Sequence, residues 1–309
     1  MCTTAVFWMM SNWFWHSPHI LLTCATLSWA GHAIAARIAV GEVSPLLLMQ
    51  LRWLFCFLIL FVVFWKQVRL YWPIVRQRWR YVALMGGAGL GGFTALFSLG
   101  AQHTTAVNLG ITQGAIPAFV MLFGLVLFST RIGRLQFLGL LVSLCGVVVL
   151  ITGGQIVMLL TLTFNLGDLL MIAACFCYAL YVLHLGKRLE MPPIIMVAYF
   201  SASAFVALTI FTIGEFTAGA LVLPSLTGMA VILYCAIFPS ILSQTFFIRG
   251  VELIGATRAG LYVNLVPVFA AFMAMAILSE PMHGYHIAAL VMVVAGIALA
   301  EKHKVTMPA

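Results

Sequence analysis

Apolar residues fill this chain in long blocks, and short polar segments separate the blocks. Ten blocks are long enough to cross the hydrocarbon core of a bilayer, which requires about 20 residues of helix. They lie near residues 19–40, 45–65, 80–102, 105–128, 135–153, 166–186, 193–214, 227–249, 255–279 and 284–301. The pattern therefore predicts an all-α membrane protein with ten transmembrane helices and no separate soluble domain.

The ten blocks form two sets of five. When the sequence is shifted by 150 positions it aligns with itself without a gap, so that Phe97 falls on Phe247 and Pro117 on Pro267, together with several glycine pairs. A gapless register of this kind indicates an internal duplication. Because each copy has an odd number of spans, the second copy must enter the membrane in the opposite orientation. We therefore predict two inverted five-helix repeats, an arrangement typical of secondary transporters.

The repeats set the expected boundaries of the chain. We expect residues 18–153 to form the first repeat, 154–301 the second, and 302–309 a cytoplasmic tail. Residues 1–17 contain Trp8, Trp13 and Trp15 but no Lys or Arg, so they resemble a cytoplasmic or interfacial segment more than a cleavable signal peptide.

Charge adds an expected orientation to this picture. The chain is 64% hydrophobic and only 7% charged, with a mean hydropathy of +1.15 and a net charge of +8. Lys and Arg gather in alternate connections, and the connection between the second and third spans holds Lys66, Arg69, Arg76, Arg78 and Arg80. Positive residues are retained on the cytoplasmic side, so we expect both termini there, in the cell's inner (plasma) membrane. We expect these charges to meet anionic lipid and not nucleic acid.

Several features together resemble one family. Besides the five-plus-five repeat, the fourth and ninth spans each carry a central proline, and Leu278-Ser279-Glu280-Pro281 leads into a last helix with glycine. This combination resembles the EamA family of the drug/metabolite transporter superfamily, and within it the YddG-type exporters of aromatic amino acids. The resemblance implies export of small amphipathic metabolites. The family tends to place Glu at the end of both spans, but here Glu280 corresponds to Thr130.

A transport site requires polar groups at mid-depth, where each unsatisfied polar group is expensive. Counting about 1.5 Å per residue from the predicted helix ends selects few such side chains. We expect the substrate to contact Trp29, His32, Thr94, Gln113, Tyr178, Tyr181, Ser243, Gln244 and Asn264. A shift of 149 places Trp29 and His32 on Tyr178 and Tyr181, so two related helices present rings that could stack on a flat ligand or simply pack together.

Helix interruptions are expected at corresponding positions of the two repeats. Proline removes a backbone hydrogen bond four residues earlier, so Pro117 and Pro267 each free a carbonyl oxygen near mid-depth. Pro239 corresponds to Gly89 in a glycine-rich run. Paired interruptions indicate a transport site, although kinks that only improve packing would give the same pattern.

The acidic residues all fall near span ends or in loops, so no carboxylate is expected at mid-depth. A proton-coupled carrier usually buries an Asp, Glu or His relay. His32 is the single candidate, and a neutral, hydrogen-bonded histidine is the favoured interpretation, which suits a facilitative exporter. Arg52 could attract a carboxylate, but the favoured interpretation is that it snorkels towards the membrane surface.

The sequence thus favours an alternating-access carrier that exports small amphipathic metabolites, with aromatic amino acids as the first candidates. Export of other metabolites or of cationic drugs by proton antiport, and a channel-like pore, are the alternatives. A channel would need a ring of equivalent groups, and a two-fold repeat offers only pairs. No nucleophile–base pair or metal-ligand cluster is visible, so we expect no enzyme activity, cofactor or metal. Small molecules and membrane lipid are the expected partners of a monomer.

Overall fold

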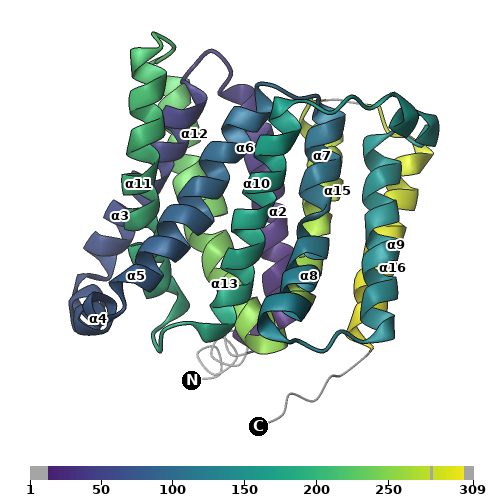
Figure 1. Ribbon diagram of the computed structural model, residues 1–309. Helices are drawn as coiled ribbons and strands as arrows, with labels where there is room; N and C mark the ends of the chain where they lie inside the picture. Colours follow the sequence, from purple (N-terminus) through teal and green to yellow (C-terminus); the bar gives the residue numbers. More distant parts are fainter. Residues whose placement is uncertain (1–12, 279–280, 303–309) are drawn as a thin grey trace, which may run out of the picture.

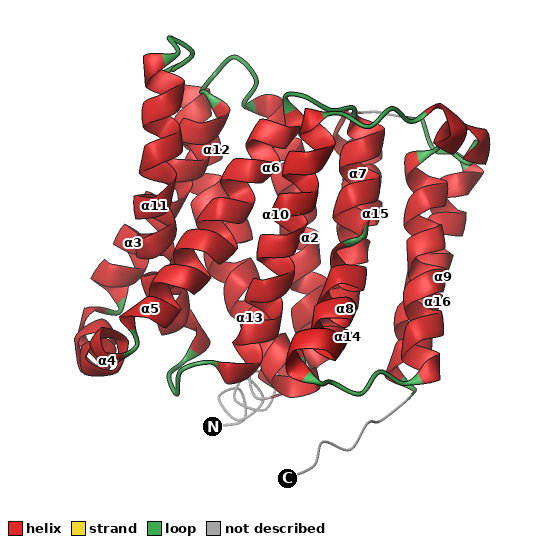
Figure 2. Cartoon of the chain, viewed as in Figure 1, coloured by secondary structure: helices red, strands yellow, loops and turns green. Residues whose placement is uncertain are grey.

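The computed structural model describes residues 13–278 and 281–302. All regular structure in this part of the chain is helical (Figure 2). Ten helices are long and apolar enough to cross a membrane, as the sequence predicts. Their ends agree with the predicted ends within a few residues. The largest difference is in the eighth span, which continues to Ile254.

The first five spans form one repeat. They are α2 (Pro18–Ile38), α3 (Pro45–Val63), a third span made of α5 (Trp79–Val82), η1 (Ala83–Gly92) and α6 (Phe93–Ala101), a fourth made of α7 (Ala106–Gly114) and α8 (Ile116–Phe128), and α9 (Arg134–Ile151). A further helix, α4 (Trp65–Gln77), links α3 to α5, and the short 3₁₀ turn η2 (Ile156–Thr161) follows α9.

The second five spans follow the same plan. They are α10 (Leu166–His184) with η3 (Leu185–Lys187), α11 (Pro193–Thr217), an eighth span made of α12 (Leu226–Cys235), η4 (Ala236–Leu242) and α13 (Ser243–Ile254), a ninth made of α14 (Ala256–Leu261), η5 (Tyr262–Asn264) and α15 (Leu265–Leu278), and α16 (Gly284–Glu301).

The packing of the spans repeats between the halves. Helix α2 packs against α13 and α15 of the second repeat, and its counterpart α10 packs against α6 and α8, the counterparts of α13 and α15. Helices α3 and α9 pack against their own counterparts, α11 and α16 (Figure 1). Exchanging each span with the span five places along leaves this pattern unchanged. The fold is therefore two five-helix repeats about a pseudo-two-fold axis, and the odd number of spans inverts the second repeat.

The predicted interruptions are present in both repeats. The third and eighth spans contain the π-helical segments η1 and η4, and the fourth and ninth spans break at Ala115 and at η5, just before Pro117 and Pro267. In the eighth span Pro239 cannot donate to the carbonyl of Cys235, and the Ser240 hydroxyl donates to that oxygen at 2.8 Å. Each of these four helices therefore changes its winding near mid-depth.

The fifth and tenth spans form a closely packed pair away from the centre of the bundle. A Cβ atom added to Gly139 would lie 2.4 Å from the carbonyl oxygen of Gly296, and one added to Gly296 would lie 2.5 Å from the carbonyl oxygen of Gly139. Only glycine permits this approach of the two backbones. These small residues therefore belong to the scaffold and not to the cavity.

Both ends of the described chain lie at one face of the bundle (Figure 1). We call it the terminal face, defined by the start of α2 at Pro18 and the end of α16 at Glu301, and we call the other the opposite face. At the terminal face His19 Nε2 lies 3.8 Å from Glu301 Oε2. Helix α4 also lies at this face, viewed nearly along its axis in Figure 1, where the sequence indicated only a charged connection.

Candidate functional site

A cavity lies in the middle of the bundle between the two repeats. The first, second, third, fourth, sixth, eighth and ninth spans contribute its walls, and α9, α11 and α16 contribute none. The lining consists of Trp29, His32, Met49, Arg52, Trp53, Leu90, Phe93, Thr94, Phe97, Gln113, Ile116, Tyr178, Gln244, Val263 and Val266. The cavity is therefore mainly apolar, with a few polar groups set among aromatic rings, as is usual for sites that bind small molecules.

Aromatic rings from four spans meet at one side of the cavity. The Trp29 and Tyr178 rings stand edge to face with centroids 6.2 Å apart, Phe93 lies 4.8 Å from Tyr178, and Phe247 lies 5.1 Å from Trp29. The indole Nε1 of Trp29 donates to the carbonyl oxygen of Pro239 at 3.1 Å, so η4 fixes the orientation of this ring. The rings of the two related helices, Trp29 and Tyr178, therefore contact each other beside the cavity.

The polar side chains of the cavity differ in what they already bind. The Thr94 hydroxyl donates to the Leu90 and Gly91 carbonyls of its own span at 2.9 and 3.0 Å. The carbonyl oxygen of Gln244 accepts from the Tyr181 hydroxyl at 3.0 Å. Gln113, which lies where α7 ends, makes no side-chain hydrogen bond to any residue that the structure describes. Its amide is therefore available to a ligand.

Arg52 is buried in the cavity wall. Its side chain is 5% exposed, its Nη1 lies 3.3 Å from His32 Nε2, and its Cζ lies 4.8 Å from the Trp53 ring centroid. The other ring nitrogen of His32 lies 3.3 Å from the Sγ of Cys235. The interpretation that Arg52 snorkels outwards is wrong, because α3 turns this side chain towards α2 and the cavity.

Three of the expected contact residues lie outside the cavity lining. The Tyr181 hydroxyl binds Gln244, the Ser243 hydroxyl donates to the Ala25 carbonyl at 2.7 Å, and the Asn264 amide donates to the Ser143 hydroxyl at 2.9 Å. All three are buried between packed helices. All the expected residues lie at a similar depth in the bundle. These three differ from the lining residues because their side chains point away from the cavity.

A sequence model of the EamA-like transporter family matches residues 16–152 and 165–301, one match in each repeat. The chain belongs to the EamA family. It is 28% identical over 291 residues to an uncharacterized transporter of Archaeoglobus fulgidus, covering 93% of this chain and 98% of the relative. It is also 28% identical over 222 residues to the uncharacterized transporter YyaM of Bacillus subtilis, covering 71% and 72% of the two chains.

A solved crystal structure supports the fold of this EamA transporter. It superposes with a TM-score of 0.74 over 92% of this chain and 96% of its own length, at 18% sequence identity. A likeness at this identity concerns the fold alone. Together with the family match and the ten spans, it establishes a multi-pass membrane transporter built from two repeats.

The expected hinge residues of the EamA transporter lie in its interrupted spans. Gly89 is in η1, and a Cβ atom there would lie 2.8 Å from the Cβ of Tyr181, so glycine allows the third span to approach α10. Pro239 is buried in η4, and Pro117 and Pro267 follow the breaks of the fourth and ninth spans. Glu280, which the family pattern singled out, lies outside the described residues.

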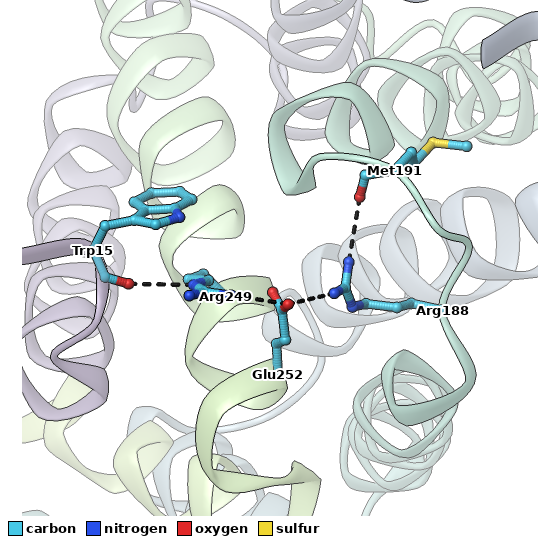
Figure 3. Close-up of polar contacts among 5 residues, drawn as sticks. All are labelled: Trp15, Arg188, Met191, Arg249 and Glu252. Atoms are coloured by element: carbon cyan, nitrogen blue, oxygen red, sulfur yellow. Dashed lines mark hydrogen bonds and ion pairs between the residues drawn. The ribbon is translucent and has the colours of Figure 1, made fainter. Parts of the chain in front are cut away.

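An ion cluster lies at the terminal face, and Figure 3 shows its polar contacts. One oxygen of Glu252, near the end of α13, lies 2.5 Å from Arg188 and 2.8 Å from Arg249. Arg249 also donates to the Trp15 carbonyl at 3.2 Å, and Arg188 donates to the Met191 carbonyl at 3.2 Å. The cluster therefore joins α13 to the connection after α10 and to the segment before α2.

This cluster was not expected from the sequence, where Lys and Arg near the span ends indicated only the orientation of the chain. Arg249 and Glu252 are nevertheless three residues apart on one helix and could be paired from the sequence. The 150-residue shift places Glu252 on Gln102 and Arg249 on Leu99, and Gln102 is exposed at the opposite face. The opposite face therefore lacks these two members of the cluster.

Proposed function

We propose that this EamA protein exports small amphipathic metabolites, with aromatic amino acids as the first candidates, by alternating access across the inner membrane. The observation that carries the proposal is the central cavity. Aromatic rings from both repeats and the unpaired amide of Gln113 surround this one space. Aromatic walls suit a flat apolar group, and this supports a substrate range like that of the YddG-type exporters.

The cavity lies nearer to the opposite face of the bundle than to the terminal face. Along α13, Gln244 lines the cavity, buried Phe247 follows, and the ion cluster occupies the end of the helix. Towards the opposite face, Met49 and Phe97 line the cavity about one helical turn from the ends of α3 and α6. This arrangement supports a carrier state that is closed at the terminal face.

The distribution of Lys and Arg supports a cytoplasmic terminal face, with both termini inside the cell. The state closed at that face is then the outward-facing state. Because the cavity lies in the middle of the bundle, between the two repeats of one chain, we propose that the monomer is the transporting unit, surrounded by lipid.

The carboxylates support transport without strong proton coupling. Among the described residues they lie near span ends or in connections, where Asp168 binds Thr104 and Asn108, Glu215 binds the first backbone N–H groups of α3, Glu42 binds Ser225, and Glu252 holds the ion cluster. None lines the cavity. We therefore propose facilitative export, because an acidic relay at mid-depth is the usual device of a proton-driven carrier.

Purified protein in liposomes tests the proposal. Vesicles loaded with unlabelled phenylalanine should take up external labelled phenylalanine transiently above equilibrium, because a carrier exchanges one substrate for another. Uptake should change little when a pH gradient or a protonophore is added. Linear flux without this counterflow would indicate a pore, and accumulation that a protonophore abolishes would indicate proton antiport. Absence of flux for a panel of amino acids, quaternary amines and sugars would contradict the proposed function.

A further inference from the structure

We infer that the substrate presents a carboxylate, or an equivalent anionic oxygen group, to Arg52. The inference rests on the proposed transport function and names the chemical class of the substrate. It begins with the charge balance of the cavity wall. Arg52 is buried, and no carboxylate of the described residues lies within 4.0 Å of its guanidinium.

A buried arginine normally binds an acid or several carbonyl oxygens, because an unpaired charge in an apolar site is expensive. Among the described residues the guanidinium has one weak acceptor, the Nε2 of His32 at 3.3 Å, and the face of the Trp53 ring. For Nε2 to accept, the imidazole must be neutral with its proton on Nδ1, which faces the Sγ of Cys235. The protein therefore leaves most of the donors of Arg52 to a ligand.

The unpaired groups around the cavity share one hydrogen-bonding character. The Nε of Arg52, the Nε1 of Trp53 and the hydroxyl of Tyr178 are buried, and none has a hydrogen-bond partner among the described residues. All three belong to residues that line the cavity, and all three can donate. Because buried polar groups are normally hydrogen-bonded, a site with several free donors fits an acceptor-rich ligand.

An ammonium group finds no equivalent partner. No carboxylate of the residues that the structure describes lines the cavity, and the carbonyl oxygen of Gln244 already accepts from Tyr181. The aromatic rings, the Gln113 amide and the hydroxyl oxygens of Tyr178 and Thr94 are the remaining groups that could face a cation, and none of them carries a negative charge. The site thus selects for the acid end of an amphipathic molecule, with the rings of Trp29 and Phe93 beside its apolar body. Cationic amphiphiles that lack an acid group are poor ligands.

Four probes with a common phenyl group test this selectivity. We would titrate purified protein with 3-phenylpropanoate, phenylalanine, phenylalaninamide and 2-phenylethylamine and follow tryptophan fluorescence, since Trp29 and Trp53 line the cavity. The two acids should bind roughly tenfold or more tightly than the amide and the amine, as expected for hydrogen bonds to a charged group. Arg52→Gln should remove this preference, and Arg52→Lys should keep it with weaker affinity for both acids.

Arg37→Gln is the matched control, because Arg37 is an exposed arginine near the end of α2 and lies outside the cavity lining. It should retain the preference for acids. The inference would be overturned if the preference for acids survived Arg52→Gln in folded protein. It would also be overturned if the wild-type protein bound the amine as tightly as the acid, or bound neither. A third outcome separates the two proposals. If acids bind in an Arg52-dependent way but no flux is measured in liposomes, the transport proposal alone is contradicted.

Discussion

At the scale of single residues, Trp29 and Gln113 differ in how far they belong to the protein's own packing. Trp29 donates to the Pro239 carbonyl and touches two other rings, so it supports the junction between α2 and the eighth span. Gln113 lines the same cavity and makes no side-chain hydrogen bond to the described residues. In the proposed site, Trp29 would combine a structural and a binding role, whereas the Gln113 amide would be free to bind the ligand.

Gln113→Ala should therefore weaken substrate binding and leave the stability of the protein nearly unchanged. Trp29→Ala should lower transport and also lower the free energy of unfolding, by about 3 kcal/mol, as large-to-small changes at packed sites do. Liposome uptake and thermal unfolding in detergent measure the two effects. Trp72→Ala, which removes a surface tryptophan of α4, is the control. Normal kinetics in a stable Gln113→Ala variant would place the substrate elsewhere.

Much of the cavity could be predicted from the sequence, because depth follows from counting residues along a helix. Trp29, His32, Thr94, Gln113, Tyr178 and Gln244 were expected in the site and line the cavity. The direction of each side chain was harder to predict, since apolar residues surround every span and no polar stripe marks its inner face. For this reason Arg52 was wrongly expected to point outwards. Asn264 was expected to face the cavity, but its side chain contacts Ser143 instead.

At the scale of helices, glycine decides which spans can touch through their backbones. The pair α9 and α16 approaches through Gly139 and Gly296, where a methyl group has no space. Gly214 in α11 provides a contrast, because a Cβ atom there meets nothing within 4 Å. The shift of 150 residues revealed the duplication and the proline breaks, but it did not reveal that α4 would be helical. The basic residues of that connection obscured its apolar positions.

Gly139→Ala should lower the free energy of unfolding by about 1–3 kcal/mol, the usual effect of adding atoms to a packed contact. Gly214→Ala should be neutral or stabilising by up to about 1 kcal/mol, because alanine favours the helix. Thermal unfolding of the two detergent-solubilised variants gives the comparison. Equal melting temperatures would show that the α9–α16 contact relaxes easily.

Helix α4 has the pattern of a helix that lies on a membrane surface. It exposes Leu70 and Trp72, buries Val68 and Val75 against the protein, and carries several of the basic residues of its connection. We expect it to lie at the lipid headgroups and to bind anionic lipid. Hydrogen exchange over residues 65–77 should slow in nanodiscs of anionic lipid relative to zwitterionic lipid, and Arg69→Gln with Arg76→Gln should reduce the difference. Identical exchange in both lipids would contradict this role.

At the scale of the whole molecule, the ion cluster of Arg188, Arg249 and Glu252 joins segments at the terminal face, where the proposed carrier state is closed. Glu252 is the shared acceptor, so Glu252→Gln should weaken both ion pairs at once. The three side chains are only partly exposed, so a combined effect of about 1–2 kcal/mol is reasonable, which is roughly a 5–30-fold change in the population of open molecules.

Thiol labelling measures this opening. In a cysteine-free background, Val263→Cys places a thiol in the cavity lining on the side of the terminal face. A reagent added at that face should label it several-fold faster when Glu252→Gln is also present. Glu42→Gln, which changes a carboxylate at the opposite face, should have no effect. Unchanged labelling in the Glu252 variant would show that Phe247 and its neighbours close the path without the cluster.

Two identical inverted repeats would give a carrier whose two access states have equal free energy, because rotation about the pseudo-two-fold axis would convert one state into the other. In this protein the halves differ where Glu252 and Arg249 correspond to Gln102 and Leu99. A difference of about 1.4 kcal/mol changes a population tenfold. For the proposed alternating-access carrier, rim side chains such as these can shift the balance between the two access states, and the preferred resting state can change while the ten-helix fold stays the same.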